Sequence, residues 1–242
     1  MRIAAKSNKG LVRASNQDSY SAGELPGGVA WAVVCDGMGG ANGGNIASVT
    51  AVRILSEHIS ASYREGMSST SIKTMLSSAM YAANVSVFDM SRSVEALAGM
   101  GTTAVAAVIS DGVAHIVHAG DSRAYIAGGG VFRQITKDHS IVQNMIESGQ
   151  LTPEEAQFHP RKNVITRALG VSETVDVDYN EAVIEPGKML LICTDGLTNY
   201  VSSERIIELI DTSSFSDLPE ILIDEANTGG GGDNITVVVL SE

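Results

Sequence analysis

The side chains best suited to chemistry in this chain are five aspartates, each in a loop beside a predicted strand: Asp18, Asp36, Asp121, Asp195 and Asp233. A carboxylate at such a place is costly unless it is solvated, paired or bound to a cation. The short side chain of aspartate holds its oxygens close to the backbone, which suits a rigid site for a hard cation. No histidine and cysteine set at zinc spacing accompanies them, so the sequence favours Mg²⁺ or Mn²⁺.

Two of these aspartates end apolar runs of the same design. Residues 29–35 predict a buried strand that ends at Asp36, and residues 189–194 predict another that ends at Asp195. Gly37 lets the backbone come close to whatever Asp36 holds. One strand end of this kind is equally well a simple turn, but its repetition beside further isolated aspartates favours a hard-metal site.

Converging carboxylates repel one another unless cations lie between them. Two metal ions roughly 3.5–4 Å apart would relieve the repulsion and create a nucleophilic hydroxide between them. Arg13 stands five positions before Asp18, and a guanidinium can clamp a phosphoryl group through paired hydrogen bonds. On its own this loop also reads as a surface turn with a salt bridge. Together the residues indicate a two-metal hydrolase of a phosphate ester.

The elements that must position these residues predict an α+β fold. A run of short strands lies between runs of helices, and short turns join antiparallel neighbours. The strands are expected at residues 3–7, 29–35, 102–110, 114–119, 124–127, 131–135, 175–179, 189–193 and 235–240, and the helices at 46–59, 72–97, 141–148, 203–211 and 217–226. The polar insertion after residue 137 contains a capping box from Thr152 to Glu155 and is of the kind that shapes a cleft or a lid.

The length, composition and net charge of the chain limit the classes of protein to which it can belong. At 242 residues with 44% hydrophobic residues, residues 1–242 predict a single domain with a sizeable core. The net charge of −12 argues against a nucleic-acid partner. No apolar run is long enough to span a membrane and no signal-peptide core is present, so we expect a cytoplasmic protein. Cys35 and Cys193 lie inside apolar runs and are expected to be buried structural thiols.

Seven motifs in order, from about residue 7 to residue 239, resemble the metal-dependent Ser/Thr protein phosphatases. This is the type 2C or PPM family, in its compact bacterial form. The motifs are Arg13-Ala-Ser-Asn-Gln-Asp18, Val34-Cys-Asp36-Gly-Met-Gly-Gly40, Gly101-Thr-Thr103, Gly120-Asp-Ser-Arg123, Asp138-His-Ser140, Thr194-Asp-Gly196 and Gly232-Asp-Asn-Ile-Thr236. The resemblance implies two central antiparallel sheets packed as a sandwich, helices on both outer faces, and a flap at about residues 141–169.

The resemblance also implies a ligand set for the metals. Asp36 would bridge two catalytic ions, Mn²⁺ or Mg²⁺, and the Gly37 carbonyl would bind one of them. Asp195 and Asp233 would complete the other. Asp121 would bind a third, weaker ion together with Asp195.

Further roles follow from the same resemblance. Arg13 would bind the substrate phosphate, Asp18 would orient metal-bound water, and Asn234 would support the last ligand loop. Many eukaryotic members carry a histidine where this chain has Met38, and methionine cannot protonate a leaving group. A water on the third metal and His159 of the flap are the two candidates for that proton, and His159 also reads as a surface histidine before a proline.

The expected reaction is direct attack of the metal-bridging hydroxide on phosphoserine or phosphothreonine of a protein. The family implies that the protein opposes a bacterial Ser/Thr kinase, and we expect a monomer. A catalytically silent pseudophosphatase would need a lost ligand, whereas all the matched aspartates are present. A two-metal nuclease would need a basic groove, which the acidic composition does not provide.

Overall fold

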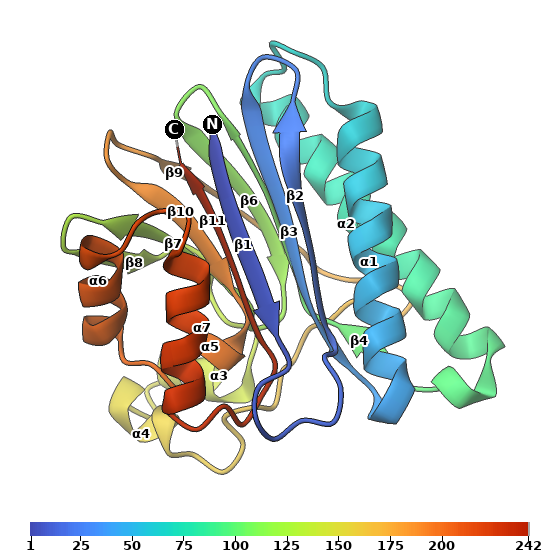
Figure 1. Cartoon of the computed structure of the whole chain (residues 1–242). Coiled ribbons are helices and arrows are strands. Elements are labelled where there is room, and N and C mark those ends of the chain that lie inside the picture. The colour runs from blue at the N-terminus through green and yellow to red at the C-terminus, as the bar shows by residue number, and fades with distance from the viewer. Residues whose placement is uncertain (242) are drawn as a thin grey trace.

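The computed structural model describes residues 1–241, except the side chains of residues 41 and 42, and consists of two antiparallel sheets between two layers of helices (Figure 1). One sheet contains, in spatial order, β1 (Arg2–Asn8), β11 (Ile235–Ser241), β10 (Met189–Cys193), β7 (Arg123–Gly128) and β8 (Val131–Gln134). The other contains β2 (Asp18–Leu25), β3 (Val29–Met38), β5 (Ala104–Ser110), β6 (Val113–Ala119) and β9 (Asp178–Val183), and β4 (Gly101–Thr102) pairs with β3. The predicted α+β sandwich is confirmed.

Helices cover both outer faces of the sandwich. The sheet of β3 packs against α1 (Gly40–Ser62), α2 (Ser69–Ser93) and the 3-10 helix η1 (Glu95–Leu97). The sheet of β10 packs against α5 (Asp195–Thr198), α6 (Ser203–Thr212) and α7 (Leu218–Thr228). The insertion contains α3 (Ile141–Glu147) and α4 (Pro153–Gln157). Among residues 1–241, no helix has both the length and the apolar character that crossing a membrane requires.

Strand β3 shows why the apolar runs do not alternate with polar residues. Ala30, Ala32 and Val34 pack against the other sheet, while Trp31 and Val33 pack against the helices. Because both faces of the strand are buried, every position is apolar. The same holds for β10, in which successive residues belong to the core between the sheets and to the core under α6 and α7.

The two cysteines are buried and unpaired, as expected. Each lies on the helix-facing side of its strand, where its side chain packs among apolar neighbours. Burial raises the pKa of the Cys193 thiol to about 12 and that of the Cys35 thiol further. Neither thiol is therefore ionised at neutral pH.

Several expected boundaries are wrong. Strand β3 continues through Met38, because its last residues pair with β4. Helix α1 begins at Gly40, directly after the glycine turn, and Val49, expected on its apolar stripe, is 49% exposed. The strand expected at residues 175–179 begins at Asp178, which is paired with His118 near the end of β6.

The short turn at residues 120–122 is expected to join two antiparallel neighbours. This prediction is wrong, because β6 and β7 are not paired. β6 belongs to one sheet and β7 to the other, so this turn carries the chain across the sandwich. The turns at 111–112 and 128–130 do join antiparallel neighbours, as expected. The crossing brings Asp121 to the end of the sandwich where β3 and β10 also end.

The flap is closed at its base by backbone hydrogen bonds. The Ile141 N–H donates to the Val164 carbonyl at 2.9 Å, and the Thr166 N–H donates to the His139 carbonyl at 2.7 Å. Within it, the predicted capping box of α4 is present, with Thr152 as the cap. The two ends of the flap therefore leave the sandwich together, next to the turn at 120–122.

Candidate active site

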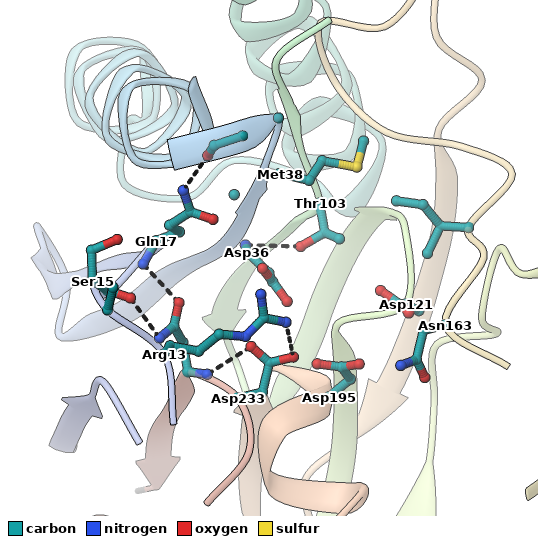
Figure 2. Close-up of a pocket in the computed structure, with 16 residues that line it drawn as sticks. Arg13, Ser15, Gln17, Asp36, Met38, Thr103, Asp121, Asn163, Asp195 and Asp233 are labelled. Carbon is teal, nitrogen blue, oxygen red and sulfur yellow. Dashed lines mark hydrogen bonds and ion pairs between the residues drawn. The ribbon is translucent and has the colours of Figure 1, made fainter. Parts of the chain in front are cut away.

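A cavity of about 480 Å³ lies at one end of the sandwich, and four of the five predicted aspartates line it: Asp36, Asp121, Asp195 and Asp233 (Figure 2). They come from four separate parts of the chain. Arg13 lines the same cavity from the loop between β1 and β2. Figure 2 shows the Arg13 guanidinium among these carboxylates. The structure thus brings together the side chains that the sequence predicts to share metal ions.

The backbone of Asp36 is held on both sides. Its N–H donates to Thr103 Oγ1 at 2.9 Å, and its carbonyl accepts from the Thr103 N–H and the Thr102 hydroxyl, each at 2.8 Å. The next residue, Gly37, packs so closely on α1 that a Cβ there would collide with the carbonyl of Gly44. Residue 37 must be glycine for this approach.

Asp18 lies behind the cavity, opposite Asp36 in the β2–β3 ladder. Its Oδ2 accepts hydrogen bonds from the hydroxyls of Thr194 at 2.9 Å and Thr236 at 2.7 Å. Its Oδ1 is buried and has no hydrogen-bond partner among the described residues. The Ser7 hydroxyl lies 2.8 Å from Thr236 Oγ1 and continues the network. Two hydrogen bonds therefore fix Oδ2 of Asp18, whereas Oδ1 can still accept a hydrogen bond.

Asp195 is the first residue of α5, a short helix that the sequence did not predict. Its Oδ2 accepts from the Asn199 amide at 2.9 Å, and its buried Oδ1 has no partner in the part of the chain that the structure describes. Asp233 accepts from the Asn234 N–H through Oδ1 at 2.8 Å, and its Oδ2 forms an ion pair with Arg13 Nη2 at 2.8 Å. Both side chains present a carboxylate oxygen to the cavity.

Asn234 joins the Asp233 loop to the loop that carries Arg13. Its side-chain amide donates to the carbonyls of Lys9 at 2.8 Å and Ser15 at 3.0 Å, and its Oδ1 accepts from the Gln17 N–H at 2.8 Å. The residue is 5% exposed. These contacts are what a support for this loop, the predicted role of Asn234, would require.

Burial and mutual repulsion raise the pKa of the clustered carboxyls. For Asp36 the pKa lies well above its ordinary value, first because of burial and then because of the charge of Asp18. Burial is also the largest cause for Asp18 and Asp121, whose pKa values rise to about 7, and for Asp195, whose pKa rises to about 6. Without a counter-charge the cluster retains protons near neutral pH.

This donor set fits divalent cations. All the side-chain donors are carboxylate oxygens, which hard ions such as Mg²⁺ and Mn²⁺ prefer. The unpartnered buried oxygens of Asp18 and Asp195 have no protein donor within the described residues. Cations bound between Asp36, Asp195 and Asp233 would compensate the charge that raises the pKa of these groups.

The flap reaches the cavity through Asn163 and Ile165. His159 is not part of the lining, and its Nδ1 accepts from the Arg161 N–H at 3.2 Å. Met38 does line the cavity. No sequence pattern predicts a place in the site for Asn163, because an isolated amide in a polar insertion is typical of any surface loop.

A second group of possible ligand atoms, from His118, His139 and Asp178, lies beside the base of the flap. The His139 Nδ1 accepts from the Gly120 N–H at 3.1 Å, so Nε2 carries the proton and faces Asp178 Oδ2 at 3.2 Å. The Arg167 guanidinium lies against both of these side chains. The positive charge of Arg167 already lies at this place, and His139 acts here as a structural hydrogen-bonding residue.

Comparison with known proteins gives a consistent result. The family model described as Protein phosphatase 2C matches residues 11–221. The "Serine/threonine phosphatase stp" of Listeria monocytogenes serotype 4b (strain F2365) is 36% identical over 244 residues, covering 99% of this chain and 95% of that protein. "Protein phosphatase PhpP" of Streptococcus pneumoniae serotype 2 (strain D39 / NCTC 7466) is 35% identical and covers 100% of this chain and 97% of its own length.

Solved structures agree. The serine/threonine phosphatase of S. agalactiae superposes with a TM-score of 0.92 at 34% identity, covering 98% of each chain. The catalytic domain of serine threonine protein phosphatase PstP in complex with two manganese ions superposes with a TM-score of 0.84 at 35% identity, covering 98% of this chain and 96% of that one. With these matches along nearly its whole length and the aspartate cluster at the end of its sandwich, the chain belongs to the protein phosphatase 2C family of hydrolases.

Proposed function

We propose that this enzyme removes phosphate from phosphoserine and phosphothreonine of proteins, with divalent metal ions as cofactors. The observation that carries the proposal is the convergence of Asp36, Asp121, Asp195 and Asp233 on one cavity beside the guanidinium of Arg13. Carboxylates supply the metal sites and the arginine supplies a phosphate clamp. The names of the relatives support a phosphorylated protein as the substrate.

Asp36, the Gly37 carbonyl, Asp195 and Asp233 would hold two ions, Mn²⁺ or Mg²⁺. When bound, such ions lower the pKa of water for direct attack on phosphorus and neutralise the phosphoryl oxygens. The two manganese ions of PstP support this number of catalytic ions. The position of Asp121 beside Asp195 in the cavity supports a third ion.

Arg13 would bind the phosphate. Its side chain is 53% exposed and is held at one end by the ion pair with Asp233, so guanidinium N–H groups remain for phosphate oxygens. Asp18 would orient the attacking water and accept its proton through the unpartnered Oδ1, because Oδ2 is already bound by two threonine hydroxyls. The buried Cys35 and Cys193 take no part.

The departing serine or threonine oxygen needs a proton. Met38 offers none, and His159 lies outside the cavity lining. We assign this proton to solvent water in the cavity. The single domain of residues 1–242, the monomeric state, the cognate Ser/Thr kinase and the cytoplasmic location stay predictions from the sequence.

The test is phosphate release from a phosphothreonine peptide by chelator-treated enzyme, with and without added Mn²⁺. We expect turnover only with Mn²⁺, and none above background for D36N at any Mn²⁺ concentration. The D36N variant must keep the circular dichroism spectrum of the wild type. Full turnover without a divalent ion would exclude this function.

A further inference from the structure

Thr103 contacts the backbone of Asp36 twice. It lies between β4 and β5 and is 3% exposed. Its Oγ1 accepts the hydrogen bond of the Asp36 N–H at 2.9 Å, and its own N–H donates to the Asp36 carbonyl at 2.8 Å. Figure 2 shows the first of these bonds as a dashed line between Asp36 and Thr103. The two bonds fix the main chain on both sides of the Asp36 Cα, from which the carboxylate side chain extends.

The same side chain contacts both neighbours of Asp121. Its Oγ1 lies 2.7 Å from the Ser122 hydroxyl, in a buried pair. On the other side Gly120 packs against it so closely that a Cβ at residue 120 would lie 2.6 Å from the Cβ and Cγ2 of Thr103. Gly120 has a φ of 111°, which favours glycine. Thr103 therefore holds the residues that come directly before and after Asp121.

Both the hydroxyl and the methyl group of Thr103 have a function in this arrangement. Valine would reproduce the shape but would leave the Asp36 N–H and the Ser122 hydroxyl without this partner in a buried place. Serine would keep the oxygen and lose the methyl group that packs on Gly120. The effects of the two substitutions can therefore be separated.

We infer that Thr103 is a positioning residue of the metal centre, which couples the Asp36 carboxylate to the Asp121 carboxylate. The inference rests on the proposed function, since it concerns the ions that this function requires. Asp36 and Asp121 lie in different segments, and the side chain of Thr103 spans both. Groups that orient metal ligands typically change metal affinity about 10- to 100-fold when they are removed.

The effect is expected to be larger for the ion at Asp121 than for the catalytic pair. Asp36 keeps the hydrogen bond of the Thr102 hydroxyl to its carbonyl when the Thr103 hydroxyl is lost. On the Ser122 side of Asp121 the turn loses its bond to Thr103. On the Gly120 side it keeps the packing on Thr103 and two hydrogen bonds to His139. T103V should therefore weaken the weakest class of Mn²⁺ sites about tenfold or more, while kcat at saturating Mn²⁺ changes less than the Mn²⁺ concentration needed for half-maximal activity.

The experiment is titration calorimetry of Mn²⁺ into the chelator-treated full chain, for wild type, T103V, T103S and S122A. S110A is the matched control, because Ser110 is a buried hydroxyl at the far end of β5 whose one hydrogen bond among the described residues is to the neighbouring Asp111. We expect weakened Mn²⁺ binding in T103V and S122A, a smaller change in T103S, and none in S110A. Circular dichroism establishes that each variant is folded.

Unchanged isotherms in T103V and S122A would overturn the inference, as would an equal loss in S110A. If T103V does not fold, the Mn²⁺ isotherms of S122A and T103S test the inference in its place. A wild-type protein that binds Mn²⁺ and hydrolyses a phosphopeptide, together with unchanged variants, contradicts only the role of Thr103. A wild-type protein that neither binds Mn²⁺ nor releases phosphate contradicts the proposed function and this inference together.

Discussion

Asp18 and Asp36 lie directly opposite each other in the antiparallel pair of β2 and β3. Residues paired in this way point to the same face of the sheet, with Cβ atoms about 4.5–5.5 Å apart. Two carboxylates at such a distance repel each other, and burial adds to the cost of their charge. Burial is the largest cause of the raised pKa of both groups. The charge of Asp18 raises the pKa of Asp36 further, and the charges of Asp195 and Asp233 raise that of Asp18. Protons therefore partly replace the bound cations when the metal is absent.

The stability of the metal-free protein should fall as the pH rises. Asp18 and Asp121 have pKa values of about 7 in the folded protein, against an ordinary value of 3.8. Between these values the folded state binds protons that the unfolded state has released, so these groups stabilise the fold at low pH and lose that contribution as the pH passes about 7. For a chain of this length, each kcal/mol corresponds to about 2–4 °C in Tm. The measurement is Tm against pH after chelation, and added Mn²⁺ should reduce the fall.

The buried histidines require a control for this experiment. Burial lowers the pKa of His115, His118 and His139, so their titration acts in the opposite direction. D121N keeps these histidines and lacks one carboxyl whose pKa is raised. Subtracting its curve cancels their contribution, and chelated D121N should lose less stability than the wild type from about pH 6 to about pH 8. Parallel curves for the two proteins would count against the assigned protonation.

Removal of either threonine hydroxyl that binds Asp18 should slow catalysis. T194V and T236V each delete one hydrogen bond to Oδ2, and a bond to a charged group contributes about 1.5–3 kcal/mol. Loss of a donor to the ionised form raises the pKa of Asp18 further, so the acid limb of the kcat profile should move to higher pH. We expect roughly a tenfold lower kcat near pH 7. T194S and T236S keep the hydroxyls and serve as controls; equal losses in the serine variants would point to packing instead.

Substitution of Arg13 should affect substrate binding more than metal binding. R13A removes a guanidinium that can form charge-assisted bonds to phosphate, so kcat/KM for a phosphopeptide should fall roughly ten- to hundredfold. R13K keeps the charge and loses the fork geometry, and should lie between R13A and the wild type. In the ion pair with Asp233 the Arg13 side chain is 53% exposed, so the pair contributes little and the Mn²⁺ isotherm should change little. A Mn²⁺ affinity that falls as much as kcat/KM would place Arg13 in the metal site instead.

The fold could be predicted as far as local pattern determines it. The doubly buried runs at β3 and β10, the turns at 111–112 and 128–130, and the capping box of α4 all have short-range signals. The crossing between sheets at 120–122 has none, because a short turn with a glycine is equally compatible with a hairpin. Helix α5 has no sequence signal, because it is only four residues long and begins at Asp195, directly after the apolar run of β10.

The site was predictable in its residue types and only partly in its geometry. Isolated aspartates beside strand ends indicated a cluster, and four of them line one cavity. The alignment of Asp18 with Asp36 depends on the register of β2 and β3, which no short motif reveals. The hydroxyl partners Thr103, Thr194 and Thr236 belong to the phosphatase-like motifs, but their roles depend on contacts between distant segments.

Asn84 is a buried polar residue that no sequence pattern distinguished from the apolar stripe of α2, and it should contribute strongly to stability. Its amide donates to the carbonyls of Ser172 at 3.1 Å and Glu173 at 3.0 Å, and its Oδ1 accepts from the Gly170 N–H at 2.9 Å. N84A would leave three backbone groups without this partner in a largely buried place. Each unsatisfied group costs about 1–3 kcal/mol, less where water enters. We expect a clear loss in the free energy of unfolding, measured by urea denaturation with Mn²⁺ present.

N84A should also impair catalysis at the active site. The segment held by Asn84 directly follows Leu169, whose N–H and carbonyl both bond to Thr102, and Thr102 in turn donates to the Asp36 carbonyl. Release of this segment removes one side of that support, so N84A should lower kcat even at temperatures where it is fully folded. D89A, a change from polar to alanine on the exposed face of the same helix, is the matched control and should alter neither quantity. If N84A were destabilised but retained the kcat of the wild type, the segment would serve the fold alone, and the path from α2 to Asp36 would carry no catalytic effect.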